Sequence, residues 1–93
     1  MGELHRRLAS PEIGLRCHFV SAGAQYFWGN RSLPVAVIDA KRRKLLLPRT
    51  PDDFDDPKGL TNKRPTKGVF RTAVPVSMSN IDDIIDLVKQ VLD

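Results

Sequence analysis

The alternation of hydrophobic and polar residues predicts several short strands in the first half of the chain. In LRCHFV (15–20), Leu15, Cys17 and Phe19 share one face, and the residues between Leu15 and Phe19 on the other face are polar. This period of two is typical of a half-buried strand, so we expect the apolar face to be buried. The next segment, AQYFWG (24–29), predicts a second strand that is rich in aromatic residues and ends at a glycine.

Three further apolar runs continue the strand pattern. LPVAVIDA (33–40) is apolar on both faces, which favours a central strand, and KLLLPR (44–49) predicts a short fourth strand. The basic quartet at 41–44 lies between them, at a spacing that suits a tight hairpin. VFRTAVPVSM (69–78) predicts a fifth strand, in which Pro75 indicates a sheet edge or a bulge because proline has no backbone donor.

The C-terminal segment SNIDDIIDLVKQVLD (79–93) predicts an amphipathic helix. Its apolar residues recur at helical spacing and form one stripe: Ile81, Ile84, Ile85, Val88, Val91 and Leu92. This stripe must cover a sheet, because no other part of the chain offers enough apolar surface. The first residues, MGELHRRLAS (1–10), are long enough for only a short N-terminal helical turn. The predicted fold class is therefore α+β, with an about five-stranded, mainly antiparallel sheet and the C-terminal helix packed on one face.

The chain has the size of one domain, so its 93 residues, 1–93, are expected to form a single unit. A long polar loop, residues 49–68, joins the fourth and fifth strands, and loops of this length often carry function or are disordered. Four acidic residues lie in this loop: Asp52, Asp53, Asp55 and Asp56. They lack the spacing and the glycine of a calcium-binding loop, so they predict a solvated segment that caps its own turns.

The net charge of +4 is unevenly distributed along the chain. Residues 1–50 carry nine Lys or Arg against three Asp or Glu, whereas residues 51–93 carry six against eight. This asymmetry suggests a basic side and an acidic side, and a basic side favours polyanionic partners. No apolar run reaches the roughly 20 residues that span a bilayer, so we expect no membrane partner. The single cysteine, Cys17, cannot form an internal disulfide, which indicates a reducing, cytoplasmic location.

The basic quartet is the first candidate site, as a projecting hairpin whose cations contact the phosphates of DNA or RNA. It consists of Lys41, Arg42, Arg43 and Lys44. Arg31, Arg49 and Lys67 are candidates to extend the same surface. The alternative is a solvated turn whose charges only discourage aggregation of sheet edges.

Few residues suggest catalysis. Asp39, Ala40 and Lys41 match the core of a nuclease class in which the acid holds Mg²⁺ and the lysine stabilises charge on the phosphate. That class needs a second upstream carboxylate on an adjacent strand, and the only upstream acids are Glu3 and Glu12. The adjacent cysteine and histidine of the first strand point to opposite faces, so they cannot act as a nucleophile and base pair. We therefore predict a non-enzymatic domain with no catalytic residue, no metal site and no cofactor.

A protein-interaction module is the alternative function. Tyr26, Phe27 and Trp28 can pack in the core, contact a partner or stack on single-stranded bases. The sheet edge indicated by Pro75 would add an unpaired strand to such a surface, because edge strands pair readily with a strand of another chain. A protein partner or a homodimer is therefore compatible with the sequence, as is a nucleic acid.

Four segments follow one another from residue 33 onward: VAVIDAKRRKLLLP, DDFDDPKGL, KGVFRTAVPVSM and IDDIIDLVKQVLD. They form an apolar strand, a basic hairpin, a leucine strand, an Asp-Pro-x-Gly-Leu loop and a helix with a Leu-x-x-Gln pattern. This order resembles a bacterial family of uncharacterised small domains labelled "predicted transport protein", which also occur appended to restriction-type and other DNA-defence proteins. The matching positions are Asp56, Pro57, Gly59, Leu60, Leu87 and Gln90.

The resemblance implies a small α/β domain without an established activity, and it gives no catalytic role to the matching positions. The chain departs from the family in its short N-terminal helical region and in RPTKGVF (64–70), where the family has a Gly-His-Trp-Gly-like stretch. The transport label finds no support in the sequence, which offers no membrane span. The expected fold is also similar to that of YjbR-like domains, for which DNA binding has been suggested.

Overall fold

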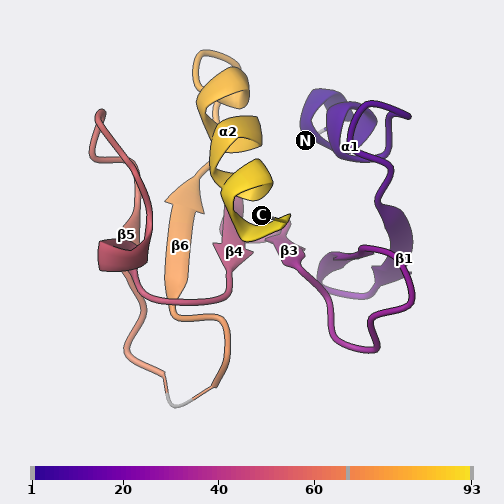
Figure 1. The fold of residues 1–93 in the computed structure, drawn as a ribbon, viewed down its shortest axis with the longest axis horizontal. Coiled ribbons are helices and arrows are strands. Elements are labelled where there is room, and N and C mark those ends of the chain that lie inside the picture. The colour runs from indigo at the N-terminus through magenta and orange to yellow at the C-terminus, as the bar shows by residue number, and fades with distance from the viewer. Residues whose placement is uncertain (1, 67, 93) are drawn as a thin grey trace.

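The computed structural model describes residues 2–66 and 68–92 of the chain. Its elements are, in order, α1 (Gly2–Leu8), β1 (Arg16–Val20), β2 (Gly23–Phe27), β3 (Ala36–Asp39), β4 (Lys44–Leu47), the 3₁₀ helix η1 (Pro51–Asp53), β5 (Asn62–Lys63), β6 (Thr72–Pro75) and α2 (Ile81–Leu92). The strands form one sheet in the order β1-β2-β3-β4-β6-β5, and neighbouring strands are antiparallel (Figure 1). This arrangement confirms the predicted α+β fold and adds one strand, β5.

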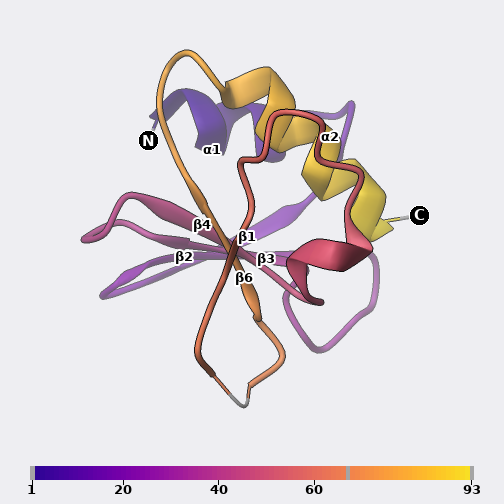
Figure 2. The ribbon, with the colours of Figure 1, turned by 90° about the vertical axis from the view of Figure 1, so that its left-hand side faces the viewer.

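Both helices lie on the same side of the sheet (Figures 1 and 2). The register places Ala24, Ile38, Leu45 and Val74 in one row across four neighbouring strands, and all of them are buried. The buried residues of α2 join the same hydrophobic core: Ile81, Ile84, Ile85, Leu87, Val88 and Val91. The predicted packing of the C-terminal helix on one face is thus confirmed.

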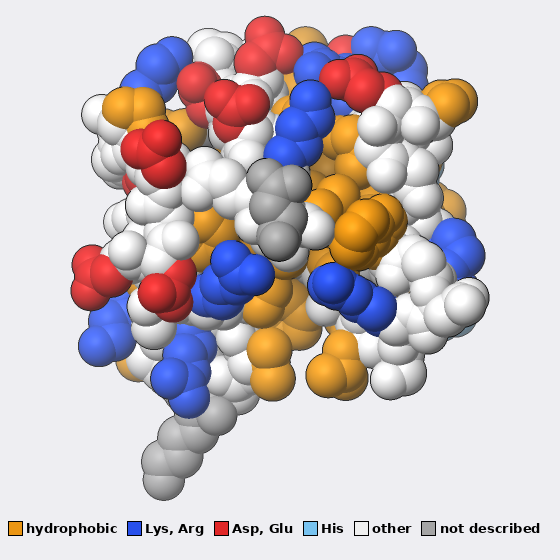
Figure 3. Space-filling view, viewed as in Figure 1, with side chains coloured by type: hydrophobic (Ala, Val, Ile, Leu, Met, Phe, Trp, Pro, Cys, Tyr) orange, Lys and Arg blue, Asp and Glu red, His pale blue; other side chains and the backbone are white. Residues whose placement is uncertain are grey.

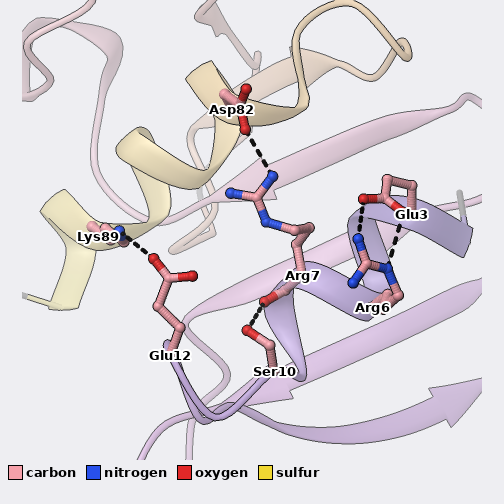
Figure 4. Close-up of polar contacts among 7 residues, drawn as sticks. All are labelled: Glu3, Arg6, Arg7, Ser10, Glu12, Asp82 and Lys89. Carbon is pink, nitrogen blue, oxygen red and sulfur yellow. Dashed lines mark hydrogen bonds and ion pairs between the residues drawn. The ribbon is translucent and has the colours of Figure 1, made fainter.

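The N-terminal segment packs beside α2 and extends the helical layer. The two leucines of α1 are fully buried in the core. Two ion pairs join this segment to α2: Arg7 lies 2.7 Å from Asp82, and Lys89 lies 3.1 Å from Glu12 (Figure 4). Exposed ion pairs typically stabilise by no more than about 1 kcal/mol, so burial of the leucines does most to hold α1 in place. Neither described helix has the length and apolar character needed to cross a membrane.

The sequence predicted a sheet edge or a bulge at Pro75. β6 is not an edge strand, because it lies between β4 and β5, but β5 does not extend as far as Pro75, so the proline lies at a local edge. The backbone N–H of Val76 donates to the carbonyl of Arg43, in the turn before β4 (2.9 Å). Since N–H groups alternate in direction along a strand, the nitrogen of Pro75 faces the opposite side, toward β5. β5 pairs only with Thr72 and Ala73, so no neighbouring strand requires a donor at Pro75.

The prediction that Phe19 shares a buried face with Leu15 is wrong for the aromatic residue. Leu15 is 5% exposed, whereas Phe19 is 69% exposed. β1 is an outermost strand of the sheet, and the seven residues of α1 leave the ring uncovered. The phenyl ring lies beside the imidazole of His5, with 5.2 Å between ring centroids. The alternation of polar and apolar residues therefore predicts correctly on which face of the sheet Phe19 lies, but it does not predict that the side chain is exposed.

The segment 49–68 carries secondary structure of its own, in η1 and β5. The carboxylate of Asp53 accepts hydrogen bonds from the backbone N–H and the hydroxyl of Thr50, at 3.3 and 3.1 Å. Asp53 thus caps η1, which is the turn-capping role predicted for the acidic residues. Phe54 follows η1 and is buried in the core, so the segment is anchored at its first third.

Replacing Leu45 with alanine should destabilise the domain by about 2–5 kcal/mol, because this side chain is fully buried in the row beneath the helices. Leu33→Ala is the matched control, since Leu33 is 66% exposed and its loss should change stability by about 0.5 kcal/mol or less. Urea denaturation followed by circular dichroism measures both variants. Equal effects would contradict the docking of α2 on this row.

Candidate nucleic-acid interface

The β3–β4 turn places the basic quartet at the tip of a hairpin. Lys41, Arg42 and Arg43 are exposed, and Lys44, the first residue of β4, is half-buried. The carboxylate of Asp39 accepts hydrogen bonds from the backbone N–H of Arg42 (3.2 Å) and from its guanidinium (2.9 Å). The quartet therefore projects into solvent, with one of its charges paired inside the turn.

Asp39, the acid of the nuclease-like segment, is engaged by Arg42. Hydrogen bonds from the side chain and the backbone of Arg42 outweigh partial desolvation and lower the pKa of Asp39. The same carboxylate closes the turn, and its side chain is only 16% exposed. Within residues 2–66 and 68–92, no group of three or more His, Cys, Asp or Glu side chains is placed to hold a metal ion.

Arg31 and Arg49 lie at the opposite end of the β3–β4 hairpin from the quartet. Arg31 precedes β3 and Arg49 follows β4. The quartet lies in the turn that joins the other ends of these two strands (Figure 2). At about 3.3 Å per residue, the run from Arg43 to Arg49 spans roughly 20 Å. The predicted site residues therefore form two separate groups and not one basic surface. Lys67 lies outside the described residues.

Five arginines lie along the end of the sheet where β2 and β4 end and β6 begins, from the edge strand β1 to the loop that follows the other edge strand, β5. We name this group the arginine end: Arg16, Arg31, Arg49, Arg64 and Arg71. Arg16 donates a hydrogen bond to the carbonyl of Gly29, in the loop that carries Arg31 (2.8 Å). Arg49 forms a β-bridge with Phe70, whose carbonyl accepts a hydrogen bond from Arg64 (2.8 Å). The backbone N–H of Arg64 donates in turn to the carbonyl of Arg71 (2.9 Å).

Two of these guanidinium groups stack on aromatic rings. The guanidinium carbon of Arg16 lies 5.6 Å from the centre of the Phe27 ring. That of Arg31 lies 4.9 Å from the centre of the Trp28 ring. Such cation–π contacts hold a guanidinium in place without neutralising its charge. Trp28 is 37% exposed, so part of its ring is open to a further stacking partner, whereas Tyr26 is fully buried in the core.

An apolar hollow of about 440 Å³ opens between Arg31 and Arg49. Its apolar lining comes from three loops and from α2, and includes Leu33, Val35, Val69 and Val91. Figure 3 shows hydrophobic side chains gathered in the middle of this face, with Lys or Arg side chains on both sides of them. A flat or apolar group bound in the hollow would therefore have a guanidinium on each side.

Among the described residues, the arginine end differs from the surroundings of the helices in its lack of ion pairs with carboxylates. Four cations near the helices form ion pairs: Arg6–Glu3, Arg7–Asp82, Lys58–Asp83 and Lys89–Glu12. In the part of the chain that the structure describes, no member of the arginine end forms such a pair. The hydrogen bonds that Arg16 and Arg64 donate to carbonyls orient their guanidinium groups but leave the charge in place. These arginines are therefore the largest group of cations without an ion pair in residues 2–66 and 68–92, and such a group favours an anionic partner.

Arg43 and Arg49 both adopt left-handed backbone conformations, with φ of 53° and 77°. This region disfavours residues that have a Cβ atom by about 1 kcal/mol, and it is usually occupied by glycine. Thr72 is fully buried, and its hydroxyl donates to the carbonyl of Arg49 (2.9 Å), which fixes this conformation within the fold. An arginine at a position where glycine would be easier points to a role of its side chain.

Asp56 organises the loop that follows η1. Burial opposes ionisation of its carboxylate, but hydrogen bonds from Thr61 and Leu60 outweigh this effect and lower the pKa of Asp56. Gln90 on α2 donates to the carbonyl of Asp55 (2.9 Å) and accepts a hydrogen bond from its N–H (2.8 Å). Four of the positions that carry the family resemblance line one hollow between this loop and α2: Asp56, Pro57, Leu60 and Leu87.

Comparison of the chain with protein-family models, with curated proteins and with solved structures gives no match in any of the three. The similarity to the bacterial family and to YjbR-like domains therefore stays a prediction. The function has to be argued from the geometry of the molecule itself.

Three members of the arginine end were not candidates in the sequence: Arg16, Arg64 and Arg71. One signal for Arg16 was available, because alternation places it on the polar face of a strand that neighbours the aromatic strand. The other two lie in and after a proline- and glycine-containing loop, whose conformation has no periodic signal. Their position beside Arg49 depends on the β-bridge to Phe70.

Replacing Asp56 with asparagine should lower the free energy of unfolding by about 1–2 kcal/mol near neutral pH, because a charged acceptor is lost. The folded-state pKa of Asp56 lies below its ordinary value of 3.8, so its contribution is fully present above that value. The contribution is lost as the pH falls through the folded-state pKa. Urea denaturation at neutral and acidic pH measures the difference between wild type and variant. A difference that does not shrink at acidic pH would contradict this role.

Proposed function

We propose that this chain is a non-enzymatic accessory domain that binds single-stranded DNA or RNA at its arginine end. One observation carries the proposal: Arg31 stacks on the exposed Trp28 and, together with Arg49, lines an apolar hollow. Neither arginine forms an ion pair with a carboxylate among the described residues. Proteins that bind single strands with little sequence preference combine a positive groove with aromatic stacking platforms. The single unpaired cysteine fits a reducing compartment, and we propose the cytoplasm.

Arg31 and Arg49 are the proposed phosphate contacts. Both line the hollow, and a guanidinium binds phosphate oxygens through paired, charge-assisted hydrogen bonds. Trp28 is the proposed platform for a base, on the part of its ring that Arg31 leaves open. The bases of a duplex are stacked on one another, so a base can enter the hollow only from a single strand.

The hairpin tip is a secondary contact in this proposal. Lys41, Arg43 and Lys44 form no ion pair with a carboxylate among the described residues. They lie roughly 20 Å from Arg49 along the hairpin, so only a longer strand could reach both groups. Their contribution would be electrostatic and would add affinity without fixing the position of a base.

Arg49→Gly and Arg43→Gly form a matched pair of variants. Each removes one positive charge and relieves a left-handed arginine, so neither is expected to reduce stability. Arg49→Gly should weaken binding of fluorescein-labelled oligo(dT) about tenfold at low salt, or about 1.4 kcal/mol. Arg43→Gly should weaken it much less. Fluorescence anisotropy measures the affinities, and urea denaturation measures stability.

The salt dependence of binding separates a defined contact from general attraction. Loss of one phosphate contact should make the slope of log K against log salt shallower by about 0.7. Equal losses of affinity in the two glycine variants would mean that net charge alone drives association, and would contradict a site at the arginine end. Absence of binding by the wild type at low salt would contradict the proposal as a whole.

Trp28 is the only tryptophan of the chain, so its fluorescence reports on the arginine end alone. A base that stacks on the indole should quench this emission when oligo(dT) is added. The quenching curve should shift to higher oligonucleotide concentration in Arg49→Gly and stay near that of the wild type in Arg43→Gly. Binding detected by anisotropy without a change in Trp28 emission would place the nucleic acid elsewhere, such as at the hairpin tip.

A further inference from the structure

The sheet has two edge strands of unequal length. β1 contributes five residues at one edge, whereas β5 contributes two at the other. A long edge presents a row of backbone N–H and C=O groups that can pair with another strand, and native sheets usually protect it with proline, lysine or a bulge. β1, with the sequence RCHFV, contains neither proline nor lysine, and all of its residues except Cys17 are exposed.

The hydrogen-bond pattern indicates which backbone groups face outward. The N–H of Ala40 donates to the carbonyl of Ala22 (3.0 Å), so the backbone groups of even-numbered residues in β2 face β3. The backbone groups of odd-numbered residues in β2 face β1, where Gln25 pairs with His18. Because backbone groups alternate in direction along a strand, the N–H and C=O groups of Cys17 and Phe19 face the open edge.

Exposed apolar side chains adjoin these unpaired backbone groups. Phe19 is 69% exposed and Val20 is 37% exposed. Phe19 also lines an apolar groove of about 330 Å³ that reaches under α1 to His5 and Ala24. Apolar surface that is continuous with unpaired backbone is typical of a face that another chain covers.

We propose that β1 is the interface of a homodimer, in which it pairs antiparallel with β1 of a second copy around a two-fold axis at His18. β1 is self-complementary in this register. Cys17 lies opposite Phe19 of the second copy, and their outward backbone groups exchange about four hydrogen bonds across the axis. On the helical side of the sheet, the ring of each Phe19 then covers Cys17 of the other copy, so both exposed rings gain an apolar neighbour.

Charge placement favours this arrangement. The two copies of Arg16 lie at opposite ends of the interface, each opposite Val20, so these arginines do not face each other. Arg31 and Arg49, the proposed phosphate contacts, lie outside β1, so the dimer does not depend on the proposed function. A five-residue strand pair is small against the roughly 1,200 Å² of a stable interface, so we expect a weak dimer.

Single-cysteine cross-linking tests the register. In a Cys17→Ser background, His18→Cys places one thiol on the proposed axis, where paired Cα atoms are about 4.5–5.5 Å apart and within disulfide reach. Mild oxidation should then give a covalent dimer that dithiothreitol reverses. Lys63→Cys in the same background, on the other edge strand, is the matched control and should stay monomeric. A His18→Cys variant that cross-links no better than this control overturns the proposal.

Sedimentation velocity tests the dimer without cross-linking. The wild type should show a reversible dimer whose fraction rises with protein concentration. Phe19→Lys puts a charge on the interface and should be monomeric, whereas Met78→Lys makes the same change at a 78% exposed residue outside β1 and should dimerise normally. Circular dichroism checks that both variants fold. A strictly monomeric wild type, or equal effects of the two lysine substitutions, overturns the proposal.

Discussion

Burial of the apolar stripe of α2 against the sheet is the interaction on which the rest of the structure depends. The strands are two to five residues long, and sheets of such strands need a covering element to be stable. The row from Ala24 to Val74 crosses four strands, and Ile84 and Val88 are buried in the same core. One helix therefore fixes the relative positions of the strand ends, and with them the loops that carry the arginine end.

Covering the sheet from one side also organises the charge of the molecule. Asp82 of α2 pairs with Arg7 of the N-terminal segment, and Lys89 of α2 pairs with Glu12 (Figure 4). Asp83 of α2 pairs with Lys58 of the loop after η1. The cations of the arginine end have no such neighbours among the described residues. Four of the eleven acidic residues are paired in this way around the helices, so a modest net charge of +4 is compatible with a group of unpaired cations elsewhere.

The fold could be predicted because its elements have their own periodicity, 3.6 residues in α2 and two in the strands. The candidate site could be predicted only in part. Local spacing placed the basic quartet at a hairpin tip, but it did not show that β3 and β4 carry Arg31 and Arg49 to the opposite end. Strand register and loop conformation bring the remaining members of the arginine end to them, and these depend on contacts between residues far apart in the sequence. Phe19 shows the same limit, because alternation predicts a face whereas burial depends on how far α1 extends.

Gln90 holds the acidic loop to α2 through a side-chain amide and a peptide group, neither of which carries net charge. Mobile ions screen charges and leave such neutral hydrogen bonds almost unaffected. The apolar layer beneath them is strengthened by salts that are excluded from protein surfaces. We therefore expect this contact between the loop and α2 to persist at ionic strengths that would weaken the proposed binding of an anion by the arginines, so folding and the proposed association would respond differently to salt.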